Sequence, residues 1–249
     1  MTSKDLFSTQ SKDYAKFRPT YPDSLLKYLA SLTPEHRLVW DCGTGNGQSA
    51  LLLAEYYDHV IATDPSEKQL ASAVSHPKIE YCVGSAEKSG LENKSVDLIT
   101  VAQAFHWFDQ PAFFSEVRRV LKPSGALAIW TYAMAKITPE VDEAVLGFYS
   151  GVLNAYWEKE RTLVEEGYRN ISFPFKEITP PDFKMSEEWS FEHLIGYLGT
   201  WSALQSYIKI NGMNPLIEYA PTLEKAWGAV KARPITWGLA LRVGFLNPG

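Results

Sequence analysis

The sequence predicts an α/β protein with a doubly wound, mostly parallel sheet, and three observations carry this prediction. A short apolar run, residues 38–42, leads directly into a glycine-rich turn and a helical pattern over residues 48–57. A second apolar run, residues 59–63, ends at an acidic residue. A third, residues 95–102, is nearly continuous in apolar residues, as a central parallel strand should be. Strand, glycine turn and helix in this order are typical of a site where a nucleotide-like ligand lies against exposed backbone.

Length and composition indicate a globular chain that can bury a full core. The 249 residues are 45% hydrophobic and 21% charged, which suits one domain with an insertion. A net charge of −5 disfavours nucleic-acid binding, because phosphate-backbone contacts need a dense basic surface. We find no apolar run long enough to span a membrane and no signal peptide, so we expect a cytoplasmic protein without membrane contact. Cys42 and Cys82 are expected to be free thiols, and no histidine cluster suggests a metal site.

The first 32 residues predict two amphipathic helices, residues 3–16 and 23–32, separated by prolines. The aromatic residues of the first segment have two interpretations. The segment could be a docking helix that covers a sheet edge. Alternatively, Tyr14, Arg18 and Tyr21 could reach over the glycine turn as a lid, and the Arg18 guanidinium could pair with a carboxylate.

The glycine turn has the pattern D-x-G-x-G-x-G, formed by Asp41, Gly43, Gly45 and Gly47. Glycines allow positive φ angles and the close approach of a ligand to the main chain. A dinucleotide fingerprint would be G-x-G-x-x-G, but Gln48 stands where its last glycine should be. The turn therefore disfavours a nicotinamide cofactor, while a purely structural glycine turn stays open.

The next elements continue the α/β pattern in order. Asp64, followed by Pro65, ends the second strand at the position where a carboxylate can hold a ribose diol. Residues 79–83 predict a third strand, residues 95–102 a fourth, and Asp109 with Pro111 opens a helix that continues to Val120. A turn over residues 122–125 precedes the fifth strand, residues 126–130.

The second half of the chain is less regular. We expect an amphipathic helix over residues 138–156, an edge strand over residues 183–189, and one long helix that begins at Ser190 and continues to Ile208. Residues 235–243 alternate strictly between apolar and polar side chains and predict a strand with one face on the core.

These motifs together resemble those of the class I S-adenosylmethionine (SAM)-dependent methyltransferases. The D-x-G-x-G-x-G turn is similar to their motif I, and D-L-I-T-V-A-Q-A-F-H-W-F (residues 97–108) and L-K-P-S-G (residues 121–125) match the regions around their fourth and fifth strands. The turn Gly84–Glu87 reads G-S-A-E where the family often has G-D-A-E, so Ser85 is a departure. The resemblance extends over residues 7–132 and implies a Rossmann-like, seven-stranded, mostly parallel sheet with a late antiparallel strand and a helical cap insertion.

The resemblance also implies the cofactor site and a division of the chain. SAM, with S-adenosylhomocysteine as product, would be held by Asp41, Gly43, Gly45, Gly47, Asp64, Pro65, Ser85, Ala86, Glu87, Gln103, Tyr14 and Arg18. The single domain 1–249 would consist of lid helices (1–34), a SAM-binding core (35–133), a cap with an edge strand (134–232) and a terminal strand (233–249). The segment G-T-W-S-A-L-Q-S-Y (residues 199–207) is similar to one in trans-aconitate-type relatives, where it caps the substrate pocket.

The predicted substrate pocket is lined by Tyr21, Trp107, Trp201 and Gln205, although the apolar stripe around Trp201 is also compatible with an ordinary core helix. Methyl transfer from a sulfonium mainly requires that acceptor and methyl carbon be held close and aligned. A carboxylate acceptor would need no base, only a cation such as Arg18. Another acceptor could use His106 as a general base, and otherwise this histidine would fix the neighbouring loop.

The leading hypothesis is a SAM-dependent methyltransferase that acts on a small molecule, such as a carboxylate resembling trans-aconitate. The sequence has no [N/D]-P-P-[Y/F/W] tetrad at the end of the fourth strand, which disfavours adenine or glutamine methylation. The alternative is a SAM-binding protein without catalysis that acts as a regulator or interaction partner. The sequence indicates no oligomeric state.

Overall fold

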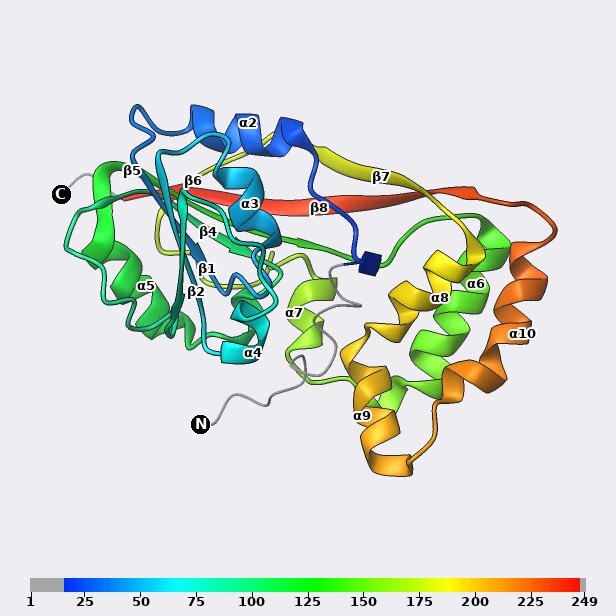
Figure 1. The fold of residues 1–249 in the computed structure, drawn as a ribbon. Helices are drawn as coiled ribbons and strands as arrows, with labels where there is room; N and C mark the ends of the chain where they lie inside the picture. Colours follow the sequence, from blue (N-terminus) through cyan, green and yellow to red (C-terminus); the bar gives the residue numbers. More distant parts are fainter. Residues whose placement is uncertain (1–15, 247–249) are drawn as a thin grey trace.

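The computed structural model describes residues 16–246 and shows a twisted sheet flanked by helices, with a helical region at one end (Figure 1). In chain order the elements are α2 (Asp23–Ser31), β1 (Leu38–Cys42), α3 (Gln48–Leu53), β2 (His59–Asp64), α4 (Glu67–Leu70), β3 (Ile79–Val83), β4 (Val96–Ala102), η1 (Phe105–Trp107), α5 (Gln110–Val120), β5 (Leu121–Tyr132), α6 (Pro139–Leu146), η2 (Gly147–Val152), η3 (Asn154–Tyr156), α7 (Arg161–Glu165), β6 (Lys176–Ile178), β7 (Phe183–Trp189), α8 (Phe191–Gly199), α9 (Ser202–Asn211), α10 (Pro215–Trp227) and β8 (Arg233–Phe245).

The strand order β3-β2-β1-β4-β5-β8-β6 confirms the doubly wound α/β prediction. Strands β1 to β5 pair in parallel, and β1 lies between β2 and β4, so that the chain reverses its direction of winding at β1. Ligands of such sheets bind outside the carboxyl ends of the strands at this switch point. Both the glycine turn after β1 and the residues after β4 therefore lie at one edge of the sheet.

The last strand, β8, joins two regions of the molecule. Its second half, residues 239–245, runs antiparallel to β5, which confirms the expected late antiparallel strand. Its first half, residues 233–239, pairs with β7 beyond the end of the parallel sheet. The sheet has eight strands, one more than the seven expected, because β6, which the sequence did not predict, also pairs with β8. In Figure 1, β7 and β8 extend toward α6, α8, α9 and α10, which form the helical cap.

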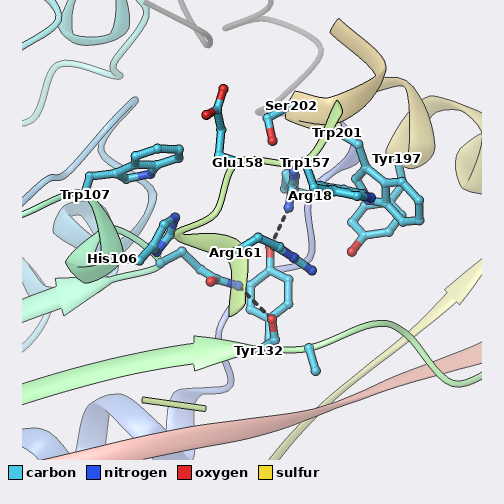
Figure 2. A pocket seen from close by; sticks show the side chains of 12 residues that line it. Arg18, His106, Trp107, Tyr132, Trp157, Glu158, Arg161, Tyr197, Trp201 and Ser202 are labelled. Carbon is cyan, nitrogen blue, oxygen red and sulfur yellow. Dashed lines mark hydrogen bonds between the residues drawn. The ribbon is translucent and has the colours of Figure 1, made fainter. Parts of the chain in front are cut away.

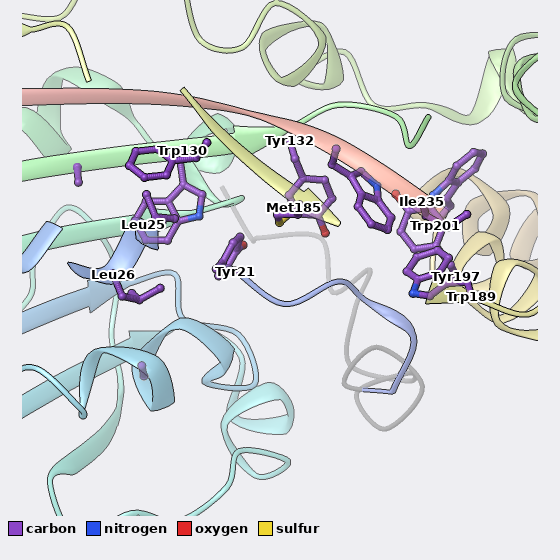
Figure 3. Packing of buried hydrophobic residues seen from close by; sticks show 14 of the residues in the cluster. Tyr21, Leu25, Leu26, Trp130, Tyr132, Met185, Trp189, Tyr197, Trp201 and Ile235 are labelled. Carbon is purple, nitrogen blue, oxygen red and sulfur yellow. The ribbon is translucent and has the colours of Figure 1, made fainter. Parts of the chain in front are cut away.

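Two hydrophobic clusters cover the two faces of the sheet. The larger one extends from α2 to the helical cap, and Figure 3 shows Tyr21, Leu25 and Trp130 near one end and Trp189 and Tyr197 near the other. The smaller cluster packs α5 against the opposite face and includes Val164, Tyr168, Ile171 and Phe175. Residues 161–175, which the sequence places inside the cap, thus pack against the parallel sheet.

Several expected helices differ from those observed. A single helix was expected over residues 138–156. Instead, α6 ends at Leu146, and a π-helical turn and a 3-10 turn follow it. The prediction of a single helix after Ser190 is wrong, because Trp201 adopts an extended conformation (φ −70°, ψ 132°) and separates α8 from α9. The sequence did not predict α7, α10 or β6. The helix expected over residues 3–16 lies almost entirely outside the described residues.

Within residues 16–246, no helix is both long and apolar enough to cross a membrane.

Candidate functional site

The glycine turn after β1 presents open backbone at only one of its three glycines. Gly43, Gly45 and Gly47 have φ angles of +71°, +58° and +82°. A Cβ at Gly43 would lie 2.5 Å from Ala104, and one at Gly47 would overlap Tyr81, so these two glycines allow close packing within the protein. A Cβ at Gly45 would meet no atom of residues 16–246 within 4 Å. Gly45 is therefore the position where a ligand can approach the main chain.

Asp41 supports the turn from inside the protein. Its side chain is fully buried and accepts hydrogen bonds from the hydroxyl groups of Thr44 (2.5 Å), Ser49 (2.6 Å) and Thr100 (2.8 Å). Burial raises the pKa of Asp41, and the three hydroxyl donors oppose that increase. Asp41, which was predicted to bind the cofactor, therefore stabilises the turn from inside and joins it to β4.

Asp64 lies at the end of β2, beside the turn. Its two carboxylate oxygens accept hydrogen bonds from the backbone amides of Gly45 and Ser66, each at 2.9 Å. Burial raises the pKa of Asp64, while these amides lower it. A carboxylate has about four acceptor sites, so two contacts leave capacity for hydroxyl donors. Pro65 follows Asp64 and leads into α4.

The three residues that were predicted to contact adenine differ in their exposure and in their contacts. Ser85 is exposed, whereas Ala86 is 6% exposed and belongs to the smaller hydrophobic cluster. The Glu87 carboxylate accepts a hydrogen bond (3.1 Å) from the backbone amide of Asp109, the N-cap residue of α5. Glu87 therefore joins the turn to α5, and the adenine contacts of all three residues stay predictions.

Gln103 at the end of β4 is one of three non-glycine residues with positive φ among residues 16–246, at +55°. Its side-chain amide donates to the carbonyl of Tyr132 (3.2 Å), and its carbonyl accepts from the Thr131 hydroxyl. Both contacts tie the end of β4 to β5. Backbone in this region is costly for a residue with a Cβ and commonly occurs at functional sites.

A pocket opens beyond the carboxyl ends of β4 and β5 (Figure 2). Figure 2 shows His106 and Trp107 on one side, Tyr197 and Trp201 on the other, and Arg161 between them. The lining residues are Arg18, Gln103, His106, Trp107, Tyr132, Ala133, Trp157, Glu158, Arg161, Tyr197, Trp201 and Ser202. Side chains from both the sheet and the helical cap therefore surround one space.

The structure brings some predicted pocket residues together and separates others. Trp107 and Trp201 line this pocket, and so do Arg18 and Gln103, which the sequence assigned to the cofactor site; the roles of all four stay predictions. Tyr21 is 8% exposed and packs edge-on against Trp130, 5.4 Å between ring centroids. Gln205 in α9 donates to the carbonyl of Gly199. The structure places neither Tyr21 nor Gln205 on the pocket, because core packing and helix-end contacts hold them elsewhere. Tyr14 lies outside the described residues.

Arg18 joins the sheet to the cap. Its guanidinium donates to the hydroxyl (2.9 Å) and carbonyl (3.3 Å) of Thr200, and to the Tyr132 hydroxyl at 3.3 Å. It also lies over the Tyr197 ring, 5.2 Å from the centroid. Nearby, Gln48 donates to the carbonyl of Pro19 at 2.9 Å, so that the segment carrying Arg18 also contacts the glycine turn's helix.

His106 is held in its uncharged form. Its Nδ1 lies 2.9 Å from the hydroxyl of Tyr168, which is completely buried and itself has a positive φ of +58°. Burial, together with the Arg161 cation, lowers the pKa of His106 to about 3. A group with this pKa is a weak base near neutral pH. The general-base role stays a prediction, without support from this environment.

Sequence reasoning missed Tyr132, Trp157, Glu158, Arg161 and Tyr197 as pocket residues. Tyr197 belongs to a stripe with helical spacing, which predicts a core position equally well. The other four follow no motif, and only their positions in the folded chain bring them together. Among residues 16–246, no group of three or more histidine, cysteine or acidic residues could hold a metal ion.

Comparison with known proteins gives consistent matches. A family model described as a methyltransferase domain matches residues 40–129. A Dictyostelium discoideum protein assigned by name to the methyltransferases is 38% identical over 227 residues, covering 90% of this chain and 86% of that protein. The structure of an Anaeromyxobacter dehalogenans protein assigned as a type II methyltransferase is 42% identical, with a TM-score of 0.85, and covers 94% of this chain and 100% of that one. A Bacillus halodurans structure with 22% identity, a TM-score of 0.51 and coverage of 90% and 99% shares the fold.

Proposed function

This chain belongs to the class I SAM-dependent methyltransferases, and we propose that it transfers a methyl group to the carboxylate of a small molecule bound in the pocket of Figure 2. The observation that carries this proposal is the neutral, weakly basic His106 beside two guanidinium groups, Arg18 and Arg161. A carboxylate is already nucleophilic at neutral pH, so its methylation needs positioning and no proton removal.

The residues around the glycine turn fit the cofactor that the family implies. Gly45 presents its main chain to a space that no atom of residues 16–246 fills, and Asp64 retains acceptor capacity beside it. We propose that these two residues, with Gly43 and Gly47 shaping the turn, hold SAM. SAM supplies an activated methyl group when it is bound. Asp41 acts through the turn, since its carboxylate is occupied by three hydroxyl groups.

The protein's contribution to the reaction is then mainly orientation and exclusion of water. The aromatic side chains of Trp107, Trp157 and Trp201 give the pocket planar walls that favour an acceptor with an apolar body. Arg18, fixed to both the sheet and the cap, favours a closed arrangement around the acceptor. Alignment of two reacting groups in such a site is worth about 7–11 kcal/mol of the barrier in well-oriented reactions.

Methyl-labelled SAM tests this proposal. The protein is incubated with labelled SAM and a small-molecule extract, and products are treated with mild base, which releases methanol from carboxyl methyl esters but not from methyl ethers, amines or thioethers. We expect small-molecule label that base converts to volatile methanol. Label that is stable to base would mean that the methylated group is not a carboxylate. Binding of S-adenosylhomocysteine without any label transfer would instead favour the non-catalytic SAM-binding protein.

A further inference from the structure

Arg161, the first residue of α7, presents a guanidinium to the acceptor pocket. Its Nε donates to the Tyr149 hydroxyl at 3.1 Å. No hydrogen bond joins its remaining four N–H donors to residues 16–246, and no carboxylate of those residues lies within ion-pair distance of it. Buried or half-buried cations are normally paired. A half-buried, unpaired guanidinium on the wall of a pocket therefore points to an anionic ligand.

Aromatic side chains hold this guanidinium in place. Its central carbon lies 5.1 Å from the Trp157 ring centroid and 5.7 Å from that of Tyr149. Trp157 is itself fixed, because its indole N–H donates to the Tyr149 carbonyl at 3.0 Å. Tyr149 belongs to the π-helical turn η2, an irregularity that often marks functional sites. Because these contacts restrict the side chain, a ligand would bind Arg161 with little further loss of side-chain entropy.

The neighbouring acids leave the positive charge available. Glu165 is bound by the hydroxyl of Tyr149 and forms no ion pair with Arg161. Glu158 lies on the same pocket wall and likewise forms no ion pair with Arg161. The charge of Arg161 reaches across the pocket, since it contributes to the lowered pKa of His106.

Arg18 differs from Arg161 in how its donors are used. Three contacts, two to Thr200 and one to Tyr132, engage its Nε, Nη1 and Nη2 atoms. These contacts connect the cap to the sheet, so Arg18 mainly holds the pocket closed. The sequence pointed to Arg18 as the cation that pairs with the acceptor, but the geometry favours Arg161 for that task.

We propose that Arg161 is the residue that binds the acceptor's carboxylate and thereby selects acids over neutral molecules of the same shape. This inference rests on the proposed function in one respect, that the pocket of Figure 2 holds the acceptor. The carboxylate on Arg161 can be the group that is methylated or a second acid group of the same molecule.

Two probes that differ only in charge test the inference. With the protein saturated by S-adenosylhomocysteine, calorimetric titration compares 3-phenylpropanoate with 3-phenylpropanamide. Because hydrogen bonds to charged groups are stronger than those between neutral groups, we expect the acid to bind about 10- to 100-fold more tightly than the amide. In Arg161→Gln this preference should fall to about twofold or less, and Arg161→Lys should retain part of it.

Arg169→Gln is the matched control, since Arg169 is exposed in the same segment and its Nε donates to the Glu166 carbonyl. It should keep the full preference for the acid, and thermal unfolding should show that all variants are folded. Equal affinity of the wild-type protein for the two probes, including no measurable binding of either, would overturn the inference. An unchanged preference in Arg161→Gln would do the same.

The result is separable from the proposed function. If the methyl label is stable to base but the preference for the acid depends on Arg161, the anion subsite stands and the methylated atom lies elsewhere on an acidic acceptor. If the label is base-labile and Arg161→Gln keeps the preference, carboxylate methylation stands and this subsite is wrong.

Discussion

The two halves of the site are built by different means. Around the glycine turn, backbone geometry and buried hydrogen bonds dominate: three positive φ angles, and Asp41 and Asp64 each bonded to nearby donors. Around the pocket beyond β4 and β5, aromatic rings and guanidinium groups from distant segments dominate. The first arrangement suits a constant ligand that is recognised through the main chain. The second suits a ligand recognised by shape and charge, which a few substitutions could change.

The connections between the halves are few and specific. The Arg18–Thr200 contact, between residues 182 apart in the chain, lies within the acceptor half and holds the cap near the sheet. Gln48 connects the two halves, because its side chain donates to the Pro19 carbonyl of the segment that carries Arg18. On the other face of the sheet, Arg242 of β8 donates to the carbonyls of Tyr168 and Ile171 and pairs with Glu177. These contacts hold the segment that carries Tyr168, whose hydroxyl lies 2.9 Å from His106 Nδ1. The comparison therefore predicts that substitutions in one half affect one ligand and that substitutions at the connections affect both.

The largest effect is expected for Gly45→Val, which should disrupt the cofactor half alone. A side chain with a positive φ costs about 1–2 kcal/mol, and here it would also fill the space that faces the turn. We expect the affinity for S-adenosylhomocysteine to fall by about 100-fold or more in calorimetric titration. Gly90→Val is the control, because Gly90 also has a positive φ (+77°) and open surroundings. Equal losses in the two variants would contradict the assignment of the turn.

Protonation of His106, in the acceptor half, should destabilise the folded protein. Its pKa is about 3 in the folded protein, below the ordinary value of 6.5, so the folded state favours the neutral form. The resulting stability is present above pH 6.5 and is lost as the pH falls toward 3. Between pH 7 and pH 4.5, urea unfolding should show wild-type protein losing about 2 kcal/mol more than His106→Gln.

If the stability of His106→Gln changes with pH as that of the wild type does, then His106 is accessible to protons in the folded protein.

Thr200→Val should weaken the acceptor half alone. The substitution keeps the side-chain shape but removes the oxygen that accepts from Arg18 and donates to the Tyr197 carbonyl. We expect kcat/KM for the acceptor to fall about tenfold, corresponding to about 1.4 kcal/mol, while affinity for S-adenosylhomocysteine stays unchanged. Thr162→Val, at an exposed position of α7, should change neither quantity. A parallel loss of cofactor affinity in Thr200→Val would show that the halves are not independent.

The smallest effect is expected for Gln48→Ala, at the connection between the halves. Its side chain holds the Pro19 carbonyl and so positions the segment that carries Arg18. Loss of one such hydrogen bond costs about 0.5–1.5 kcal/mol. We expect losses of about threefold both in affinity for S-adenosylhomocysteine and in kcat/KM for the acceptor. An effect on only one ligand would place Gln48 within that half.

Much of the fold was predictable because its signals are local. The apolar run of β4, the pattern of β8 and the glycine turn after β1 follow from neighbouring residues, and the parallel sheet with a late antiparallel strand is confirmed. The turn expected over residues 122–125 is wrong, because β5 already begins at Leu121. The failures have a common cause. The helix expected after Ser190 breaks at Thr200 and Trp201 because contacts with Arg18 and with distant aromatic rings outweigh local helical periodicity.

The sequence by itself determined the family and the glycine turn, since the pattern of glycines and of an acid at a strand end lies within a few residues. Only the tertiary structure decided which side chains meet in the acceptor pocket. Tyr132, Trp157, Arg161 and Tyr197 come from separate elements, and no short-range pattern records their proximity. It also decided how charges are used: the donors of Arg18 bind the protein, those of Arg161 face the pocket, and burial keeps His106 neutral. These properties depend on long-range packing and desolvation, which arise only when the chain is folded.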